Sequence, residues 1–320
     1  MRRIFLVGMG PTALSALESL FDRFEVVGLS RAAAEGADAV LDLAKGRGVP
    51  LFADLSVAAV AEAIQRAAPD CVVVSSYHRV LPAKLVAERP FVNVHYAPLP
   101  RYRGRANVNW AIINGDPGTA ITIHRLAPEL DGGNILLQSE IAIGPEDSVA
   151  DLYQRLNALQ RQHLGETVER FLDGAAGTPQ DERRATYGCT RLPRDGRIDW
   201  TRPAAQVAAL VRALAPPYPG AFTHLDGRKL IVWKAAVPDD APRYEGRIPG
   251  RPVRIARGEG FVDVLCGDAT LRLHEVQRPG GPRVPAAEVL KSVKLTLGLS
   301  TEDLLTRIEE LERQLASRKV

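Results

Sequence analysis

The sequence predicts an α/β protein in which a doubly wound, mostly parallel sheet is followed by a small β-barrel. Strand-type runs alternate with helical patterns over the first 95 residues, which is typical of a parallel sheet with helices on both faces. The run Cys71–Val74 is entirely apolar, as expected for a strand covered on both sides. After residue 199, a series of short strand-type runs with turn signals between them favours a small barrel.

The elements of the first part follow in a regular order. Strands are predicted at residues 4–7, 24–29, 49–52, 71–74 and 91–95, and helices at 13–20, 37–45, 57–67 and 81–88. A helix at 107–113, strands at 120–126 and 134–143, and a long helix from 148 to 172 come next. Ligands of parallel sheets bind beyond the carboxyl ends of the strands, and the run 91–95 brings Asn93 and His95 to such an end.

The second part follows a segment at 174–196 that is rich in Gly, Pro, Thr and charge, and we expect this segment to be a linker. A helix at 207–214 precedes strands at 221–225, 229–233, 253–256, 261–265 and 269–274, and Asp226-Gly227 is a hairpin signal. A last helix starts near Glu302 and carries an apolar stripe that we expect to pack on its own chain. The expected domains are 1–185, 199–283 and a helical tail at 284–320.

Composition restricts the classes of function. The chain has 320 residues and a formal net charge of +3, which is too small to indicate a nucleic-acid binder by composition alone. Cys71, Cys189 and Cys266 lack metal-ligand spacing, so we expect no metal. No apolar run reaches the roughly 18 residues of a membrane span, and the N-terminus is too short in its apolar part for a signal peptide. We therefore expect a soluble, cytoplasmic protein without a membrane partner.

A glycine motif near the N-terminus offers one functional hypothesis. Gly8-Met9-Gly10-Pro11-Thr12-Ala13 lies between a strand and a helix, as the fingerprint of dinucleotide-binding folds requires. The second strand ends in Leu29-Ser30-Arg31 without the acid that would hold the ribose, and Ser30 and Arg31 could at most accommodate a 2′-phosphate. A tight turn in any α/β domain is the explanation that we favour for the glycines, and an NADP-binding oxidoreductase is the alternative from another class.

Asn93, His95 and Asp131 surround a basic loop that contains Arg101, Arg103 and Arg105. An imidazole can carry a proton near pH 7, a carboxylate can orient it, and an amide can donate to an oxygen that becomes negative. No serine or cysteine occurs on the 91–95 strand or in its loop to act as a nucleophile. The constellation suits direct transfer of an acyl-type group through a tetrahedral intermediate, and a satisfied polar cluster at a strand end is the alternative.

Several motifs occur in a fixed order along the chain. They are Asn93-Val94-His95, residues 99–104 (LPRYRG), Thr122-Ile123-His124, Asp131-Gly132-Gly133, residues 195–200 (DGRIDW) and residues 217–222 (PYPGAF). Together they resemble the 10-formyltetrahydrofolate-dependent formyltransferases, and the sugar N-formyltransferases among them most of all. The resemblance implies a Rossmann-like catalytic domain followed by an OB-like barrel, with Asn93, His95 and Asp131 as the catalytic residues. It also implies a folate site formed by Tyr77, His78, Arg79, Val80, Leu81, Gly132, Gly133 and Ile135. Ala97-Pro98 departs from the family's usual Ser-Leu and puts the substrate side in doubt.

The acceptor of the formyl group is expected to be a primary amine of a small molecule, with a nucleotide-linked amino sugar as the first candidate. The resemblance assigns Tyr96, Arg103, Gly104 and Arg105 to substrate binding, and arginine suits a nucleotide phosphate. Residues 30–38 lack the basic insertion that methionyl-tRNA formyltransferases carry, which argues against a nucleic-acid partner. Hydroxyornithine and methionyl-tRNA remain alternative acceptors, a non-catalytic folate-binding module is a further hypothesis, and a homodimer is left open.

Overall fold

The computed structural model describes residues 1–32, 38–299 and 301–317. The chain forms two compact units. The first consists of Met1–Val108, Pro117–Gly144 and Asp151–Thr190, and the second of Asn109–Asp116, Pro145–Ala150 and Arg191–Val320. Two short segments from within the first part of the sequence therefore belong to the second unit.

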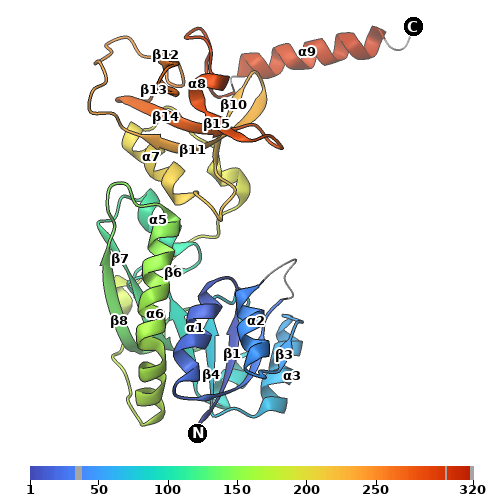
Figure 1. Ribbon diagram of the computed structural model, residues 1–320, viewed down its shortest axis with the longest axis vertical. Helices are drawn as coiled ribbons and strands as arrows, with labels where there is room; N and C mark the ends of the chain where they lie inside the picture. Colours follow the sequence, from blue (N-terminus) through green and yellow to red (C-terminus); the bar gives the residue numbers. More distant parts are fainter. Residues whose placement is uncertain (33–37, 300, 318–320) are drawn as a thin grey trace. The chain divides into compact units, whose positions relative to one another are not determined.

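A seven-stranded sheet forms the centre of the first unit, with the strand order β3-β2-β1-β4-β5-β7-β8 (Figure 1). The strands are β1 (Arg3–Gly8), β2 (Glu25–Ser30), β3 (Leu51–Phe52), β4 (Cys71–Ser75), β5 (Phe91–His95), β7 (Gly118–Arg125) and β8 (Ile135–Ala142). β1 to β5 are parallel, whereas β7 runs antiparallel to β5 and β8 antiparallel to β7. The predicted doubly wound, mostly parallel sheet is confirmed.

Helices cover both faces of this sheet. They are α1 (Thr12–Phe21), α2 (Ala39–Gly46), α3 (Val57–Ala67), α4 (Ala83–Ala87) and α6 (Val149–Leu172), whereas most of α5 (Asn107–Ile113) belongs to the second unit. Gln160 of α6 donates a hydrogen bond to Ser75 Oγ of β4, whereas Ile64 of α3 packs in one cluster with the neighbouring Val74. Adjacent residues of a strand point to opposite faces, so α6 and α3 lie on opposite sides. α4 begins later than predicted, after Pro82, and residue 37 of the predicted second helix lies outside the described residues.

The segment predicted as a linker is, over its first part, an integral piece of the first unit. Its short strand β9 (Tyr187–Gly188) pairs in parallel with β6 (Arg103–Gly104) in the basic loop. Thr186 Oγ1 accepts the backbone N–H of Tyr102 at 2.9 Å, and Thr178 forms a bridge with Ile135. The linker prediction is wrong here because composition records turns and charge but not long-range pairing.

An antiparallel sheet forms the second unit, with the order β10-β11-β14-β13-β12 and β15 beside β14. The elements are α7 (Ala204–Ala213), β10 (Ala221–Leu225), β11 (Arg228–Ala236), β12 (Pro252–Ala256), β13 (Phe261–Leu265), β14 (Thr270–Gln277), β15 (Arg283–Pro285), α8 (Ala286–Val289) and α9 (Thr301–Ser317). Two short 3₁₀ turns, at Glu182–Arg184 in the first unit and Pro193–Gly196 in the second, complete the list. The β10–β11 turn at Asp226 and Gly227 has φ values of 49° and 71°, so the predicted hairpin is confirmed.

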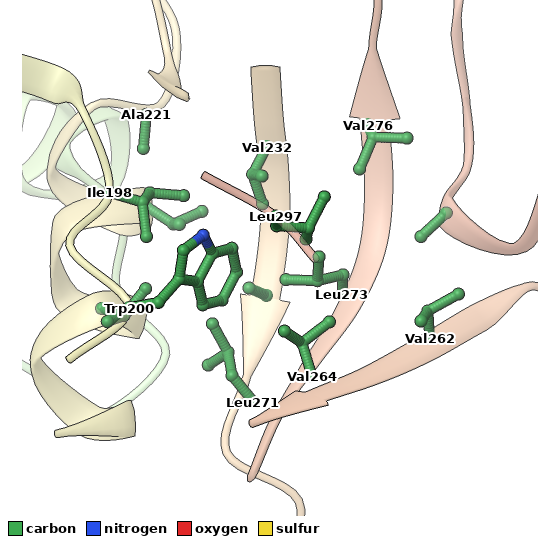
Figure 2. Packing of buried hydrophobic residues seen from close by; sticks show 14 of the residues in the cluster. Ile198, Trp200, Ala221, Val232, Val262, Val264, Leu271, Leu273, Val276 and Leu297 are labelled. Atoms are coloured by element: carbon green, nitrogen blue, oxygen red, sulfur yellow. The ribbon is translucent and has the colours of Figure 1, made fainter. Parts of the chain in front are cut away.

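Trp200 lies in the core of the second unit. Its indole packs among Val264, Leu271 and Leu297 (Figure 2). Its Nε1 donates to Thr223 Oγ1 at 2.9 Å, so the buried polar end of the ring is satisfied.

None of the helices in the described part of the chain has the length and hydrophobicity of a membrane span.

Candidate functional site

Asn93 and His95 point to the same face of β5, because they are two residues apart in a strand. The antiparallel neighbour β7 places His124 opposite Asn93 and Thr122 opposite His95. Directly paired residues of antiparallel strands are neighbours on one face of a sheet. Two strands therefore bring an amide and two imidazoles onto a single patch.

Asp131 reaches this patch from the turn after β7, with a left-handed backbone conformation (φ of 50°) that few non-glycine residues adopt. Its Oδ2 accepts the backbone N–H of Gly104 at 2.9 Å and lies 3.6 Å from Nδ1 of His95. Its Oδ1 accepts from Nδ2 of Asn93 at 3.3 Å and lies 3.6 Å from Nε2 of His124. The structure thus brings together the three residues that the sequence singled out, and it adds His124.

The ring of His95 is buried, and its two nitrogens have different partners. Nε2 lies 2.8 Å from the carbonyl oxygen of Tyr102 and 3.0 Å from Nδ2 of Asn107. The carbonyl oxygen is the nearer group and can only accept, so we assign the hydrogen to Nε2. In the neutral ring, Nδ1 then presents a lone pair toward Asp131. Burial lowers the pKa of His95, and the negative charge of Asp131 opposes this effect without cancelling it. At pH 7 His95 is therefore neutral, with Nδ1 ready to accept a proton.

His124 fixes the amide of Asn93. Nδ1 of His124 lies 3.0 Å from the carbonyl oxygen of Arg125 and donates to it, so Nε2 is an acceptor. Nδ2 of Asn93 lies 3.0 Å from this Nε2 and donates one hydrogen to it, while the other goes to Asp131. The bond to Asp131, at 3.3 Å, is the longer of the two. The Asn93 amide is thus oriented from both sides.

The carboxylate of Asp131 is ionised over the whole physiological range. Burial raises the pKa of Asp131, but the contact with His124, the positive charge that His95 carries in acid and the N–H of Gly104 outweigh it and lower the pKa to about 2. A permanent negative charge therefore lies beside Nδ1 of a neutral His95.

The Asp131 turn is held by a chain of hydrogen bonds that leads to Arg103. Gln180 Nε2 donates to the carbonyl oxygens of Asp131 and Gly133, both at 2.7 Å. Gln180 Oε1 accepts from the Arg103 guanidinium at 2.8 Å, and Glu182 accepts two more bonds from it at 2.6 and 2.8 Å. Arg103 is only 1% exposed. Arg103 therefore adds no exposed charge to the basic loop, because its own side chain is buried and the exposed Glu182 and the half-buried Gln180 accept its hydrogen bonds.

Gly133 and Gly104 contribute through their backbones. A Cβ at Gly133 would lie 1.8 Å from the carbonyl oxygen of Arg125, so no side chain fits there. Gly104 has a φ of 96° and donates its N–H to Asp131. Gly132 N donates to Glu129 O at 3.2 Å within the turn. These glycines allow the turn and the loop to approach each other closely.

Tyr96 and Arg105, the other expected substrate residues, have contrasting surroundings. The Tyr96 hydroxyl lies 2.7 Å from Asn157 Oδ1 and 2.6 Å from Gln160 Oε1, and burial raises the pKa of Tyr96. Tyr96 therefore faces α6. Arg105 is exposed and forms no ion pair with the described residues. A ligand can therefore reach the charge of Arg105, whereas the hydroxyl of Tyr96 already contacts α6.

The residues expected to contact folate lie in or beside a buried apolar cluster. Leu81 and Phe91 belong to one buried cluster, and Tyr77 and Leu126 pack against it. Phe91 shares its face of β5 with Asn93, so this cluster continues directly into the polar patch. Of the remaining expected residues, three are exposed and Ile135 is half-buried. The exposed ones are His78, Arg79 and Val80.

The N-terminal glycine turn has its own internal partners. Arg31 forms a buried ion pair with Asp38 at 2.6 Å and donates to Gly10 O at 3.1 Å. The guanidinium that could have bound a 2′-phosphate therefore already has partners within the chain.

Among the described residues, no group of three or more His, Cys, Asp or Glu is arranged to hold a metal ion.

Comparison with known families gives this geometry its context. Residues 26–168 match the formyl transferase family, and residues 192–294 match the C-terminal domain of formyl transferases. A methionyl-tRNA formyltransferase of Geobacter sulfurreducens is 35% identical over 261 residues, which cover 80% of each chain. The chain belongs to the formyltransferase family.

Solved structures share the fold of this formyltransferase. WlaRD, a sugar 3N-formyl transferase crystallised with dTDP and 5-N-formyl-THF, aligns with a TM-score of 0.65 at 15% identity over 88% of this chain and 99% of its own. HypX from Aquifex aeolicus in complex with tetrahydrofolic acid aligns with a TM-score of 0.63 at 18% identity over 92% of this chain. This chain spans about half the length of HypX, 47% of it.

Sequence reasoning missed His124 and Gln180 as parts of the site. His124 stands in the Thr122-Ile123-His124 motif, and strand alternation placed it on one face with Thr122. Only the antiparallel pairing of β7 with β5 puts that face beside Asn93. Gln180 carried no local signal, because its segment has the composition of a linker.

Proposed function

We propose that this formyltransferase moves the formyl group of 10-formyltetrahydrofolate to a primary amine, and that the acceptor is a nucleotide-linked amino sugar. The observation that carries the transfer chemistry is the neutral, buried His95 with Nδ1 3.6 Å from the ionised Asp131, beside the Asn93 amide. Because the described side chains on this patch include no serine or cysteine, the acceptor amine itself attacks the formyl carbon.

His95 acts as the proton acceptor. The attacking amine gains positive charge as its bond to the formyl carbon forms, and Nδ1 of His95 removes the proton directly or through one water. The imidazolium that results gains a hydrogen bond and a charge interaction with Oδ2 of Asp131. Asp131 therefore lowers the barrier by stabilising a charge that exists only during transfer. The tetrahedral intermediate collapses when the bond between the formyl carbon and N10 of the folate breaks, and the proton on His95 passes to N10, so tetrahydrofolate leaves and His95 is neutral again.

Asn93 acts on the formyl oxygen. Its 3.3 Å hydrogen bond to Asp131 is the weaker of its two, so a formyl oxygen beside Nδ2 can take over that hydrogen. The hydrogen bond strengthens as negative charge develops on the oxygen. His124 keeps the amide in this orientation throughout.

The described residues fit a formyl-carrying pterin. The donor supplies the one-carbon group, and the chain offers a flat ring partly buried apolar side chains next to polar groups. Tyr77 and Leu126 form the apolar part, backed by the buried Leu81 and Phe91, and the Asp131 turn with Gly132 borders the polar patch. Small-molecule sites commonly combine such an apolar lining with a few polar groups.

Arg105 supports a nucleotide-linked acceptor. It stands on the loop that includes Gly104, whose N–H binds Asp131, so an acceptor bound at Arg105 lies near the transfer site. Its guanidinium is exposed and without an ion pair in the described part of the chain, and it can bind a diphosphate through two parallel hydrogen bonds.

The test is an assay of tetrahydrofolate release from 10-formyltetrahydrofolate with nucleotide-linked amino sugars, hydroxyornithine and charged initiator tRNA as acceptors. We expect turnover with a sugar nucleotide and a raised KM for it in Arg105→Met. The same variant should react normally with the free amino sugar, which has no phosphate for Arg105 to bind. Turnover with none of the sugars would refute the acceptor, and full activity of His95→Ala would refute the mechanism.

Methionyl-tRNA is the second candidate, favoured by a different observation. Residues 191–299 contain 18 Lys and Arg against 11 Asp and Glu, so this part of the sequence has a net charge of +7, compared with +3 for the whole chain. Positive charge attracts the phosphates of RNA by releasing counterions. The segment after β2 is not basic, although residues 33–37 of it lie outside the described residues. Formylation of charged tRNA that weakens steeply with salt would favour this acceptor.

A further inference from the structure

Helix α9 (Thr301–Ser317) carries a row of exposed apolar side chains. Leu304, Leu305, Ile308, Leu311 and Leu315 are each between 42% and 61% exposed. Among the described residues of the chain, none buries this row. The expectation that the stripe packs on its own chain is therefore wrong, and an exposed apolar row of this length needs a partner.

The spacing of the row is that of a coiled coil. Leu304, Ile308, Leu311 and Leu315 are separated by four, three and four residues. This alternation is the d, a, d, a pattern of a heptad repeat, in which the apolar seam recurs every 3.5 residues. A helix that packs on a globular core shows a wider stripe with a period of 3.6. Leu305, at an e position, borders the seam.

The residue types on the seam are compatible with two parallel strands. A β-branched residue at a with leucine at d favours the parallel dimer, and α9 has Ile308 at its first a position with Leu304 and Leu311 at d, whereas Leu315 fills the second a position. An isolated helix of this length is marginal in water, so burial of the seam is the natural source of its stability.

The charges beside the seam complement those of a second copy. With Ile308 at a, Arg307 occupies a g position and Glu312 the e position of the next heptad. In a parallel dimer a g residue faces the e residue five positions further along the other helix. Arg307 of each copy then meets Glu312 of the other, twice by symmetry. In the single chain Arg307 pairs with Glu310 at 2.9 Å, whereas no ion pair of Glu312 occurs among the described residues.

We propose that α9 is a dimerisation helix that binds α9 of a second copy of this chain as a short, parallel, two-stranded coiled coil. The contact is isologous, so it closes at two chains and does not propagate. It is independent of the acceptor and of the transfer mechanism.

The first test is the mass of the full-length protein in solution over a dilution series. We expect a dimer of twice the 34.7 kDa chain at the upper end of the series. Leu311→Glu puts two like charges into the seam and should raise the dimer dissociation constant at least about 100-fold. Arg313→Glu, at the outer f position, is the control and should leave the dimer intact. A wild-type chain that is monomeric throughout would overturn the proposal.

The second test reads the pairing itself. Arg307→Glu places Glu opposite Glu in the homodimer, and Glu312→Arg places Arg opposite Arg, so each should weaken self-association roughly tenfold. Mixed together, the two variants restore opposite charges at both contacts and should form a heterodimer. If the mixture associates no better than either variant alone, the parallel register is wrong.

The third test fixes the orientation. In a background of Cys189→Ser, which removes the exposed native thiol, Leu311→Cys brings the two d-position sulfurs together across a parallel seam. Oxidation should yield a covalent dimer, and Arg313→Cys in the same background should not. A dimer in solution without this cross-link would refute the parallel arrangement.

Discussion

Asp131→Asn is the substitution that tests the transfer chemistry most directly. It keeps the size of the side chain and removes only the charge that stabilises protonated His95. At 3.6 Å and an effective dielectric of about 20, that interaction amounts to about 4.5 kcal/mol. The amide dipole retains part of it, so kcat/KM should fall between about 10²- and 10³-fold. KM for folate should change little, because the charge acts in the transition state.

The measurement is steady-state release of tetrahydrofolate, accompanied by thermal unfolding. Native packing lowers the pKa of Asp131 from 3.8 to about 2, which corresponds to about 2 kcal/mol of stability at pH 7. This contribution to stability is present above the pKa of the carboxyl in the unfolded chain and is lost as the pH falls toward 2. At pH 7 the variant should therefore unfold at a lower temperature than the wild type. A folded Asp131→Asn enzyme with kcat/KM within threefold of wild type would refute the assigned role of Asp131.

Three further predictions concern the same site. His124→Ala leaves the Asn93 amide without its acceptor and should lower kcat about tenfold with little change in KM; an equal change in both would contradict an orienting role. Gly133→Ala would bring a methyl group 1.8 Å from a carbonyl oxygen, so thermal unfolding should reveal a loss of more than about 2 kcal/mol, and wild-type stability would exclude this clash. Burial lowers the pKa of His95 from its usual value of 6.5, so as the pH is lowered kcat/KM should start to fall only at a pH below 6.5, where His95 becomes protonated; a fall that starts above pH 6.5 would contradict a neutral His95 base.

The sequence predicted the sheet and the three central residues because their signals are local. Apolar runs that alternate with helical patterns indicate β1 to β5. The two-residue spacing of Asn93 and His95 in a strand predicts that they point to the same face. The antiparallel insertion of β7 beside β5 left no such signal, so the site lacked His124. Strand order depends on contacts between segments that are remote in the sequence.

Arg103 shows why the exposed charges of a site cannot be predicted from the sequence alone. In the sequence it stands between two other arginines of one loop, which is the pattern of a positive surface. Its partners Gln180 and Glu182 lie 77 and 79 residues further along the chain, in a segment without apolar periodicity. Charge near a site can be counted from sequence, but the fold decides which charges remain accessible.

The hydrogen bonds from Gln180 to the Asp131 turn also set the order in which the site can form during synthesis. The sheet from β1 to β8 and helix α6 are complete at Leu172, before Gln180 has been added. A nascent chain of that length contains Asn93, His95, His124 and Asp131, but the carbonyls of the Asp131 turn still lack their donor. The scaffold is therefore complete in sequence eight residues before the donor that fixes the candidate site has been added.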